Sequence, residues 1–181
     1  MRKTAASALL NVMQARYDYD VTYMKTMLAA SPKAFFEFAK LFGLSRHREA
    51  APKAAVFAAK LVAALVEDCG PCTQLVVNMA RQAKVASSDM QAVLRRDATA
   101  MSADAALGFR FAEAIAYRLP DEDEIRDAVR AAWGEKGVID LSLAFAISRV
   151  FPTTKAGMGF AKECRRVTVD GVGVDVVKRA A

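Results

Sequence analysis

Residues 53–66 form an apolar, alanine-rich segment. Charged side chains interrupt or flank it only at seven-residue intervals, at Lys53, Lys60 and Glu67. About seven residues make two turns of an α-helix, so this spacing places the three charges on one side of a helix. A strand would instead show β-branched residues in alternation. The segment therefore predicts an apolar helix that ends near Glu67.

A second helix is predicted to follow after a short break, in the stretch Cys69-Gly70-Pro71-Cys72. Gly70 allows a sharp bend, and Pro71 suits the first turn of a helix, where its missing N–H has no partner to lose. Cys69 and Cys72 are three residues apart and share one helical face, so their sulfurs can meet. Thiols at a helix N-terminus face the positive end of its dipole, which favours thiolate and lowers the pKa from about 8.5. This is the environment of a redox dithiol.

Helix signals recur along the rest of the chain with short connections, so the predicted fold class is all-α. Serine, threonine and aspartate stand at expected N-caps, and glycine or proline follows expected ends. The tail around Gly171 alternates apolar and polar residues and is predicted to be extended. The expected helices are 4–16, 20–30, 33–42, 50–66, 71–84, 87–97, 102–118, 121–133 and 138–150, with the extended tail at 167–177.

Thioredoxins also carry Cys-Gly-Pro-Cys, but there the motif lies between a strand and a helix, and the segment before Cys69 is not a strand. An apolar helix that runs into a Cys-x-x-Cys helix resembles the carboxymuconolactone decarboxylase and alkylhydroperoxidase D-like superfamily. Residues 147–159, then Cys164 and 167–171, resemble the closing part of some members. The resemblance covers 15–172, most closely at the dithiol, and implies an oligomeric helical bundle.

The resemblance also implies a chemistry. Cys72 would be the residue that attacks a hydroperoxide, and Cys69 would resolve the intermediate to a disulfide. A dithiol donor, such as a lipoyl-bearing protein, would then reduce the pair. Glu67, two residues before Cys69, is the candidate local base, although a charged carboxylate so close would also raise a thiol pKa.

Two positions depart from the family pattern. The histidine that peroxidatic members place four residues after the second cysteine is Val76 here, and the glutamate about three turns before the first cysteine is Phe57. Glu67 is a candidate substitute for this relay. Asn78 is a poor one, because six residues place it about 120° away from Cys72 around the helix.

The composition limits the remaining possibilities. A chain of 181 residues predicts a single domain, 1–181. The net charge of +6 is spread out, without the basic runs and interleaved aromatics of a nucleic-acid-binding surface. Three cysteines are too few for a secreted disulfide framework, and no segment is long and apolar enough for a membrane span, so a cytoplasmic protein is expected.

The single histidine, His47, lies between two expected helices and is interpreted as a surface loop residue. The alternatives are that it reaches the dithiol, or that it joins Cys69, Cys72 and Cys164 in a zinc site. The spacing carries no zinc signature beyond the one Cys-x-x-Cys pair, so neither a metal nor a cofactor is predicted.

Two function classes remain open at this stage. The first is a thiol-dependent peroxidase or disulfide oxidoreductase that uses Cys69 and Cys72. The second is a helical oligomer with a structural or regulatory dithiol, which the departures at Val76 and Phe57 favour. A lactone decarboxylase is a weaker third option, because that activity does not require a cysteine pair. Large apolar residues, as in 35–42 and 138–151, predict a homo-oligomer.

Overall fold

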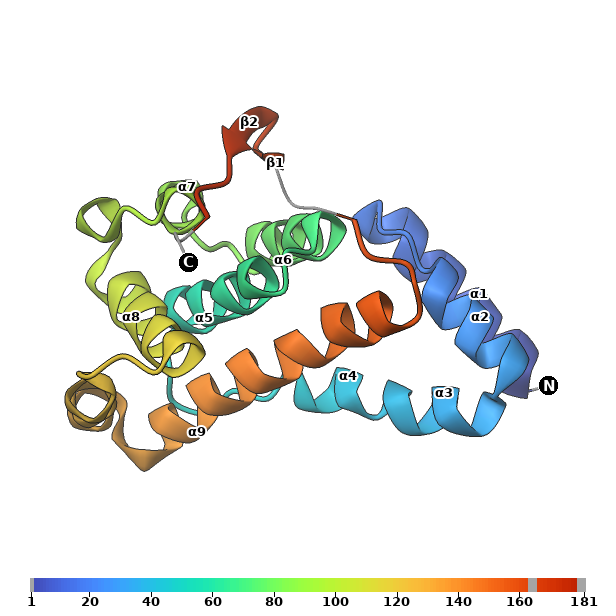
Figure 1. The fold of residues 1–181 in the computed structure, drawn as a ribbon, viewed down its shortest axis with the longest axis horizontal. Helices are drawn as coiled ribbons and strands as arrows, with labels where there is room; N and C mark the ends of the chain where they lie inside the picture. The colour runs from blue at the N-terminus through green and yellow to red at the C-terminus, as the bar shows by residue number, and fades with distance from the viewer. Residues whose placement is uncertain (1, 163–165, 179–181) are drawn as a thin grey trace.

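A computed structural model describes residues 2–162 and 166–178 of the chain. The described part is mostly helical, with one small antiparallel sheet, so the all-α prediction is confirmed at this coarse level (Figure 1). The elements are α1 (Arg2–Tyr17), α2 (Thr22–Ala30), α3 (Pro32–Ala39), α4 (Leu41–Leu44), α5 (Lys53–Val66), α6 (Gly70–Gln82), α7 (Ser87–Arg95), the 3-10 turn η1 (Ala98–Ala100), α8 (Ala103–Tyr117), α9 (Glu122–Gly157), β1 (Arg166–Val169) and β2 (Val172–Asp175).

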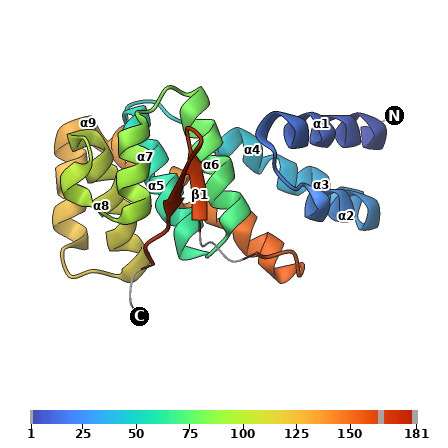
Figure 2. The ribbon, with the colours of Figure 1, turned by 90° about the horizontal axis from the view of Figure 1, so that it is seen from above.

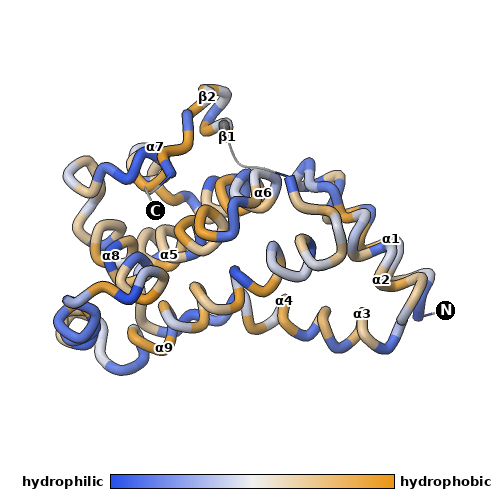
Figure 3. Tube along the Cα trace, viewed as in Figure 1, coloured by the Kyte–Doolittle hydropathy of each residue, from blue (hydrophilic) through white to orange (hydrophobic). Residues whose placement is uncertain are grey.

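Helix α5 is the centre of the larger part of the molecule. Most of its residues are buried, including Lys60, and helices α6, α7, α8 and α9 pack around it. Figure 3 shows it as a hydrophobic stretch. Helix α8 approaches it so closely that a Cβ added at Gly108 would lie 2.3 Å from the carbonyl oxygen of Ala55. The apolar segment noted in the sequence is therefore the core helix of this bundle.

The N-terminal helices form a second hydrophobic cluster of their own. Leu10, Tyr23, Met24 and Phe35 are buried in it, and helices α1 to α3 extend away from the bundle (Figures 1 and 2). Residues of α6 and the end of α9 also pack against this cluster. A third, small cluster contains Cys69 and Cys72. The dithiol thus belongs to neither large core.

Several predicted helix ends are confirmed and others are wrong. Ser31 and Ser102 cap α3 and α8 through their side chains, as expected. Gly43, however, does not end a helix, because α4 continues through it to Leu44. The N-cap of α7 is Ala86 rather than a residue of 87–89, because the Asp89 carboxylate is used elsewhere and accepts bonds from the backbone N–H and hydroxyl of Ser102.

Helix α9 combines two expected helices. Gly134, with φ of 68°, breaks the helical conformation where a turn was predicted. Beyond it the second part runs to Gly157 rather than stopping at 150, and it includes the buried Pro152. A proline within a helix removes one backbone hydrogen bond, which explains why the sequence suggested an earlier end.

The predicted extended tail is a β-hairpin. Asp170 and Gly171 both have positive φ values, 48° and 81°, as a type I′ turn requires. The side chain of Gln74 on α6 holds β1 by donating to the carbonyl of Thr168, at 2.9 Å, and accepting from its N–H, at 2.8 Å. Within the described ranges, we find no helix with the length and apolarity needed to cross a membrane.

Candidate functional site

The two cysteines stand where α5 passes into α6. Cys69 is the N-cap of α6, Gly70 and Pro71 open its first turn, and Cys72 follows, so the predicted start of the helix is confirmed. The two sulfurs are joined in a disulfide, with a Cα–Cα distance of 5.2 Å. The predicted meeting of the two side chains is therefore confirmed.

The bend between the helices is a Schellman-type ending of α5. Asp68 has a positive φ of 48°, its N–H donates to the carbonyl of Leu65 at 3.1 Å, and the N–H of Cys69 donates to that of Ala64 at 3.3 Å. This turn carries an aspartate where glycine is usual. Asp68 also pairs with Lys178, at 3.0 Å.

The first turn of α6 is held by two further contacts. The buried Thr73 hydroxyl donates to the carbonyl of Cys69, at 3.0 Å. The N–H of Gly70, which has no partner within its own helix, donates to the carbonyl of Lys162 at 3.0 Å. Both contacts fix the backbone on which the disulfide is mounted.

The disulfide is almost completely covered, since Cys69 is 2% exposed and Cys72 is 5% exposed. Cys72 nevertheless borders a cavity of about 100 Å³, whereas Cys69 is not among its lining residues. Three parts of the chain enclose this cavity: the N-terminal helices and their connections, helices α5 and α6, and the second half of α9. Its lining includes Met13, Tyr19, Tyr23, Phe42, Ser45, Lys60, Ala64, Cys72, Val76, Phe151 and Pro152.

Tyr19 brings a polar group to the sulfur. Its hydroxyl lies 3.8 Å from Sγ of Cys72, a weak hydrogen-bond distance suited to sulfur. Burial raises the pKa of Tyr19 to about 12, so the phenol is neutral at ordinary pH and can donate a proton to a thiolate. Tyr23 lies beside Tyr19, but its hydroxyl has no hydrogen-bond partner among the described residues. The main cause that raises the pKa of Tyr23 is burial, and the neighbouring Tyr19 raises it further.

Two buried lysines flank this group. Lys60 lines the cavity, and burial lowers its pKa to about 8. Lys155, on α9, is completely covered, with its ammonium nitrogen 4.9 Å from the centre of the Tyr19 ring and 5.7 Å from that of Tyr23. Among the described residues its nitrogen has no hydrogen-bond partner, and burial lowers its pKa too.

Neither the two tyrosines nor the two lysines were predicted from the sequence as site residues. Lys60 could have been recognised as unusual, because it is the one charged residue within the apolar stretch 54–66, where a solvated charge is not expected. No local pattern marked Tyr19, Tyr23 or Lys155, since packing between distant segments brings the two tyrosines to the cavity and Lys155 to their rings.

Glu67 lies at the end of α5 but is engaged away from the sulfurs. Its Oε1 accepts from Nε of Arg149 at 2.6 Å, and its Oε2 lies 3.0 Å from the Thr153 hydroxyl. Among the described residues these are its hydrogen-bond partners. The candidate base is thus paired with Arg149 of α9.

The two positions that depart from the pattern of the resembled family, Val76 and Phe57, both lie in apolar surroundings. Val76 packs with Ala64, Cys69 and Cys72 and lines the cavity. Phe57 packs against the main core, and the Lys60 nitrogen lies 5.2 Å from its ring centre.

Asn78 is used structurally, since its amide donates to the carbonyl of Tyr17 at 3.0 Å and so ties α6 to the end of α1. That Asn78 takes no part in a proton relay at Cys72 stays a prediction.

His47 lies beside Asp140 rather than beside the dithiol. Its Nε2 is 3.5 Å from Oδ1 of that buried carboxylate, which also accepts from the backbone N–H groups of Glu49, Ala50 and Ala51. This position agrees with the interpretation of His47 as a loop residue. Cys164 lies outside the described residues, and in the described part no group of three or more His, Cys, Asp or Glu side chains is arranged to hold a metal ion.

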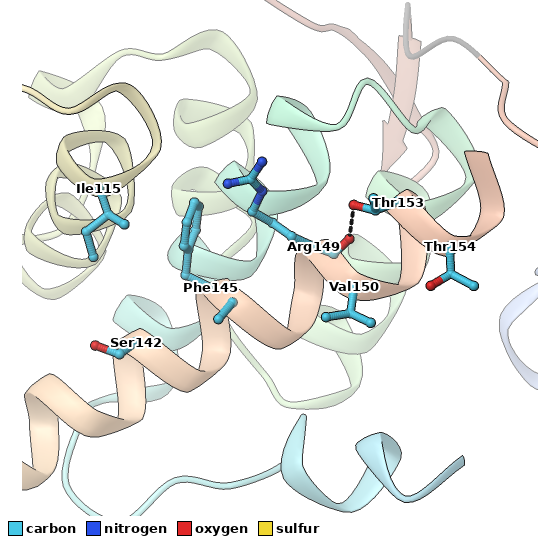
Figure 4. A pocket seen from close by; sticks show the side chains of 8 residues that line it. Ile115, Ser142, Phe145, Arg149, Val150, Thr153 and Thr154 are labelled. Carbon is cyan, nitrogen blue, oxygen red and sulfur yellow. Dashed lines mark hydrogen bonds between the residues drawn. The ribbon is translucent and has the colours of Figure 1, made fainter. Parts of the chain in front are cut away.

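A second and larger hollow, of about 590 Å³, follows α9 on another side (Figure 4). Figure 4 shows Phe145, Arg149, Val150 and Thr153 along it, with the Thr153 hydroxyl bonded to the Arg149 carbonyl at 2.6 Å. Its lining contains no thiol, and its charged residue, Arg149, is paired with Glu67. We therefore place the candidate site at the smaller cavity beside Cys72.

Comparison of the chain with protein-family models, with curated proteins and with solved structures gives no match. The resemblance noted from the dithiol helix therefore stays an expectation, and the geometry of the cavity carries the functional argument.

Proposed function

We propose that the protein is a thiol-disulfide redox protein that reduces small organic hydroperoxides through Cys72 and Cys69. The observation that carries the proposal is that Cys72, joined to Cys69, borders a small and mostly apolar cavity with the Tyr19 hydroxyl 3.8 Å from its sulfur. A buried structural disulfide would not need a polar hydroxyl and a lysine facing it across a cavity.

In the proposed reaction the Cys72 thiolate attacks the distal oxygen of the hydroperoxide. The O–O bond breaks, the sulfur becomes a sulfenic acid, and the alkoxide leaves as an alcohol after it gains a proton. The Cys69 thiol then attacks the Cys72 sulfur, so that the disulfide forms and water leaves. A dithiol donor restores both thiols by exchange and is itself oxidised to a disulfide.

The burial of the pair restricts the donor. With both cysteine residues at most 5% exposed, a reductant has to enter the cavity beside Cys72. A small dithiol, or one carried on a long flexible arm as in a lipoyl-bearing protein, meets this requirement.

The test measures peroxide consumption by protein whose third thiol has been removed by Cys164→Ser. We expect reduced protein to consume one peroxide per molecule, to lose both thiols, and to turn over with dithiothreitol. Mass spectrometry should find Cys69 and Cys72 joined in one peptide. Cys72→Ser should abolish consumption, and Tyr19→Phe should slow it, whereas Tyr17→Phe, at the partly exposed end of α1, should not.

A second candidate function is a structural or regulatory dithiol in a protein without turnover. The ion pair of Glu67 with Arg149 and the apolar side chain of Val76 favour it, because both remove acid-base groups from the sulfurs. Reduced protein that keeps both thiols in excess hydroperoxide would decide for this candidate.

A further inference from the structure

Lys60 is placed unlike any other residue of α5. It stands in the middle of the apolar core helix and is only 7% exposed, yet it ends at the cavity beside Cys72. Buried lysines are rare unless they are paired. Within the described residues no carboxylate lies within ion-pair distance of its nitrogen, and its hydrogen bond goes to the backbone carbonyl of Ser45, at 2.6 Å.

Lys60 and Cys72 both line this small cavity. Its volume is about 100 Å³, and a water molecule takes roughly 30 Å³ in the liquid. Only a few waters, or one small substrate, therefore fit in the cavity that the two residues line. In such a poorly hydrated space a charge on one group acts strongly on the other, and a single water can carry a proton between them.

The other charged or titratable groups near Cys72 do not replace Lys60. Tyr19 and Tyr23 are held neutral, since burial raises the pKa of each. Lys155 lies over the two tyrosine rings and is not among the residues that line the cavity. Glu67 is engaged by Arg149.

We propose that Lys60 is the proton acceptor and charge partner of the Cys72 thiol, in place of the acid-base relay that is missing at Val76 and Phe57. This inference rests on the proposed function. In the first step the neutral amine takes the thiol proton, giving Cys72 thiolate and Lys60 ammonium. After the O–O bond breaks, the ammonium returns that proton to the departing alkoxide, which leaves as the alcohol.

The properties of the amine fit this task. Burial lowers the pKa of Lys60 to about 8, and an ordinary cysteine thiol has a pKa of about 8.5. A proton can therefore pass in either direction at little cost, as acid-base catalysis requires. The Tyr19 hydroxyl, on another wall of the cavity, can donate to the thiolate that results.

The first measurement is the pKa of the Cys72 thiol in protein carrying Cys69→Ser and Cys164→Ser, from the pH dependence of its alkylation by iodoacetamide. Loss of a nearby positive charge should raise a thiol pKa by about one unit or more. We expect this rise for Lys60→Met. Lys53→Met, which removes an exposed lysine two turns earlier on α5, should leave the value unchanged.

Lys60→Arg separates the two roles, because arginine keeps the charge but does not release its proton. It should leave the thiol pKa low and yet slow peroxide turnover in the protein that retains both cysteines. The loss should approach the roughly 10²–10⁴-fold typical of acid-base assistance. Lys60→Arg also keeps the test decisive if Lys60→Met does not fold.

The outcomes distinguish this inference from the proposed function. Wild-type protein that consumes peroxide, together with Lys60→Met and Lys60→Arg variants that match its rate, overturns the role of Lys60 and leaves the function standing. A thiol pKa that rises in Lys60→Met, in a protein that consumes no peroxide, supports the charge partnership and overturns the function. A pKa unchanged in Lys60→Met overturns the partnership.

Discussion

Val76 is one turn beyond Cys72 on the same face of α6 and lines the same cavity. A histidine there could accept and return protons near the sulfur, because imidazole titrates near neutral pH. We predict that Val76→His increases the initial rate of hydroperoxide consumption by reduced protein, measured with dithiothreitol in excess. Val76→Leu, which changes the size of the side chain without adding a proton carrier, is the matched control.

An equal gain from both Val76 variants would mean that cavity shape, not acid-base chemistry, had changed. If the wild type is inactive with every dithiol tried and Val76→His gives no gain, the structural dithiol is favoured.

Asp140 is a fully buried carboxylate that fixes the loop before α5. Burial alone would raise its pKa, but the N–H groups of Ala50, Ala51 and Glu49 outweigh burial and hold the pKa below its usual value. A lowered pKa in the folded state stabilises the protein above the unfolded value of about 3.9, and this contribution is lost as the pH falls through the folded value. We predict that Asp140→Asn reduces the free energy of unfolding at pH 7 by about 1–3 kcal/mol.

The difference between wild type and Asp140→Asn should shrink as the pH falls from about 4 through the lowered folded pKa of Asp140, since the carboxyl is protonated first in the unfolded chain and then in the folded protein. Urea unfolding at several pH values measures it. A difference that stays constant down to the most acidic pH at which the protein folds would show that the charge of Asp140 has no part in its effect.

At the scale of elements, α8 approaches the backbone of α5 closely at Gly108. The Ala55 carbonyl would lie only 2.3 Å from an added Cβ, and backbone atoms cannot give way as a flexible side chain does. We predict that Gly108→Ala lowers the free energy of unfolding by about 1–3 kcal/mol, the usual cost of overpacking, as measured by urea denaturation. Gly157→Ala is the control, because no atom lies within 4 Å of a Cβ there.

An alanine at 157 should be neutral or slightly stabilising, since alanine favours a helix more than glycine does. A Gly108→Ala protein as stable as wild type would mean that α5 and α8 can separate slightly without loss.

Elements whose ends depend on neighbouring residues could be predicted from the sequence. Pro71, Ser31 and Ser102 act within one turn of their own positions, and the structure has helices beginning there. The N-cap of α7 could not be predicted, because Asp89 bonds to Ser102, thirteen residues away.

The same distinction between local and long-range contacts applies to the residues of the candidate site. Cys69 and Cys72 meet because of local helix geometry, and their pairing was predicted. Tyr19 reaches Cys72, and Lys155 reaches Tyr19, only through packing between distant segments, which no local pattern encodes. Glu67 stays a candidate base, and its hydrogen bond with Arg149, 82 residues away, could not be predicted from any local pattern.

At the scale of the whole molecule, assembly stays a prediction. Leu9 and Val12 are 66% and 61% exposed, and as residues three apart they share the outer face of α1. We predict that light scattering returns a mass above the 19.6 kDa of one chain. Leu9→Glu should reduce that mass if α1 lies in the interface, whereas Val172→Glu, at an exposed position on β2, should not.

A mass of one chain at micromolar concentration, for the wild type, would contradict the homo-oligomer. A larger mass that both variants retain would place the interface elsewhere on the molecule.

The covered disulfide has a consequence for how the N-terminal helices can be studied. A small thiol that fits the cavity can attack Cys72 in the closed protein, but a protein reductant can do so only after the helices that carry Met13, Tyr23 and Phe42 have moved aside. The ratio of the two reduction rates therefore measures how often that part of the chain detaches, as amide hydrogen exchange does for backbone opening. The Cys69–Cys72 bond is in this sense an internal chemical probe of slow motion in the protein that contains it.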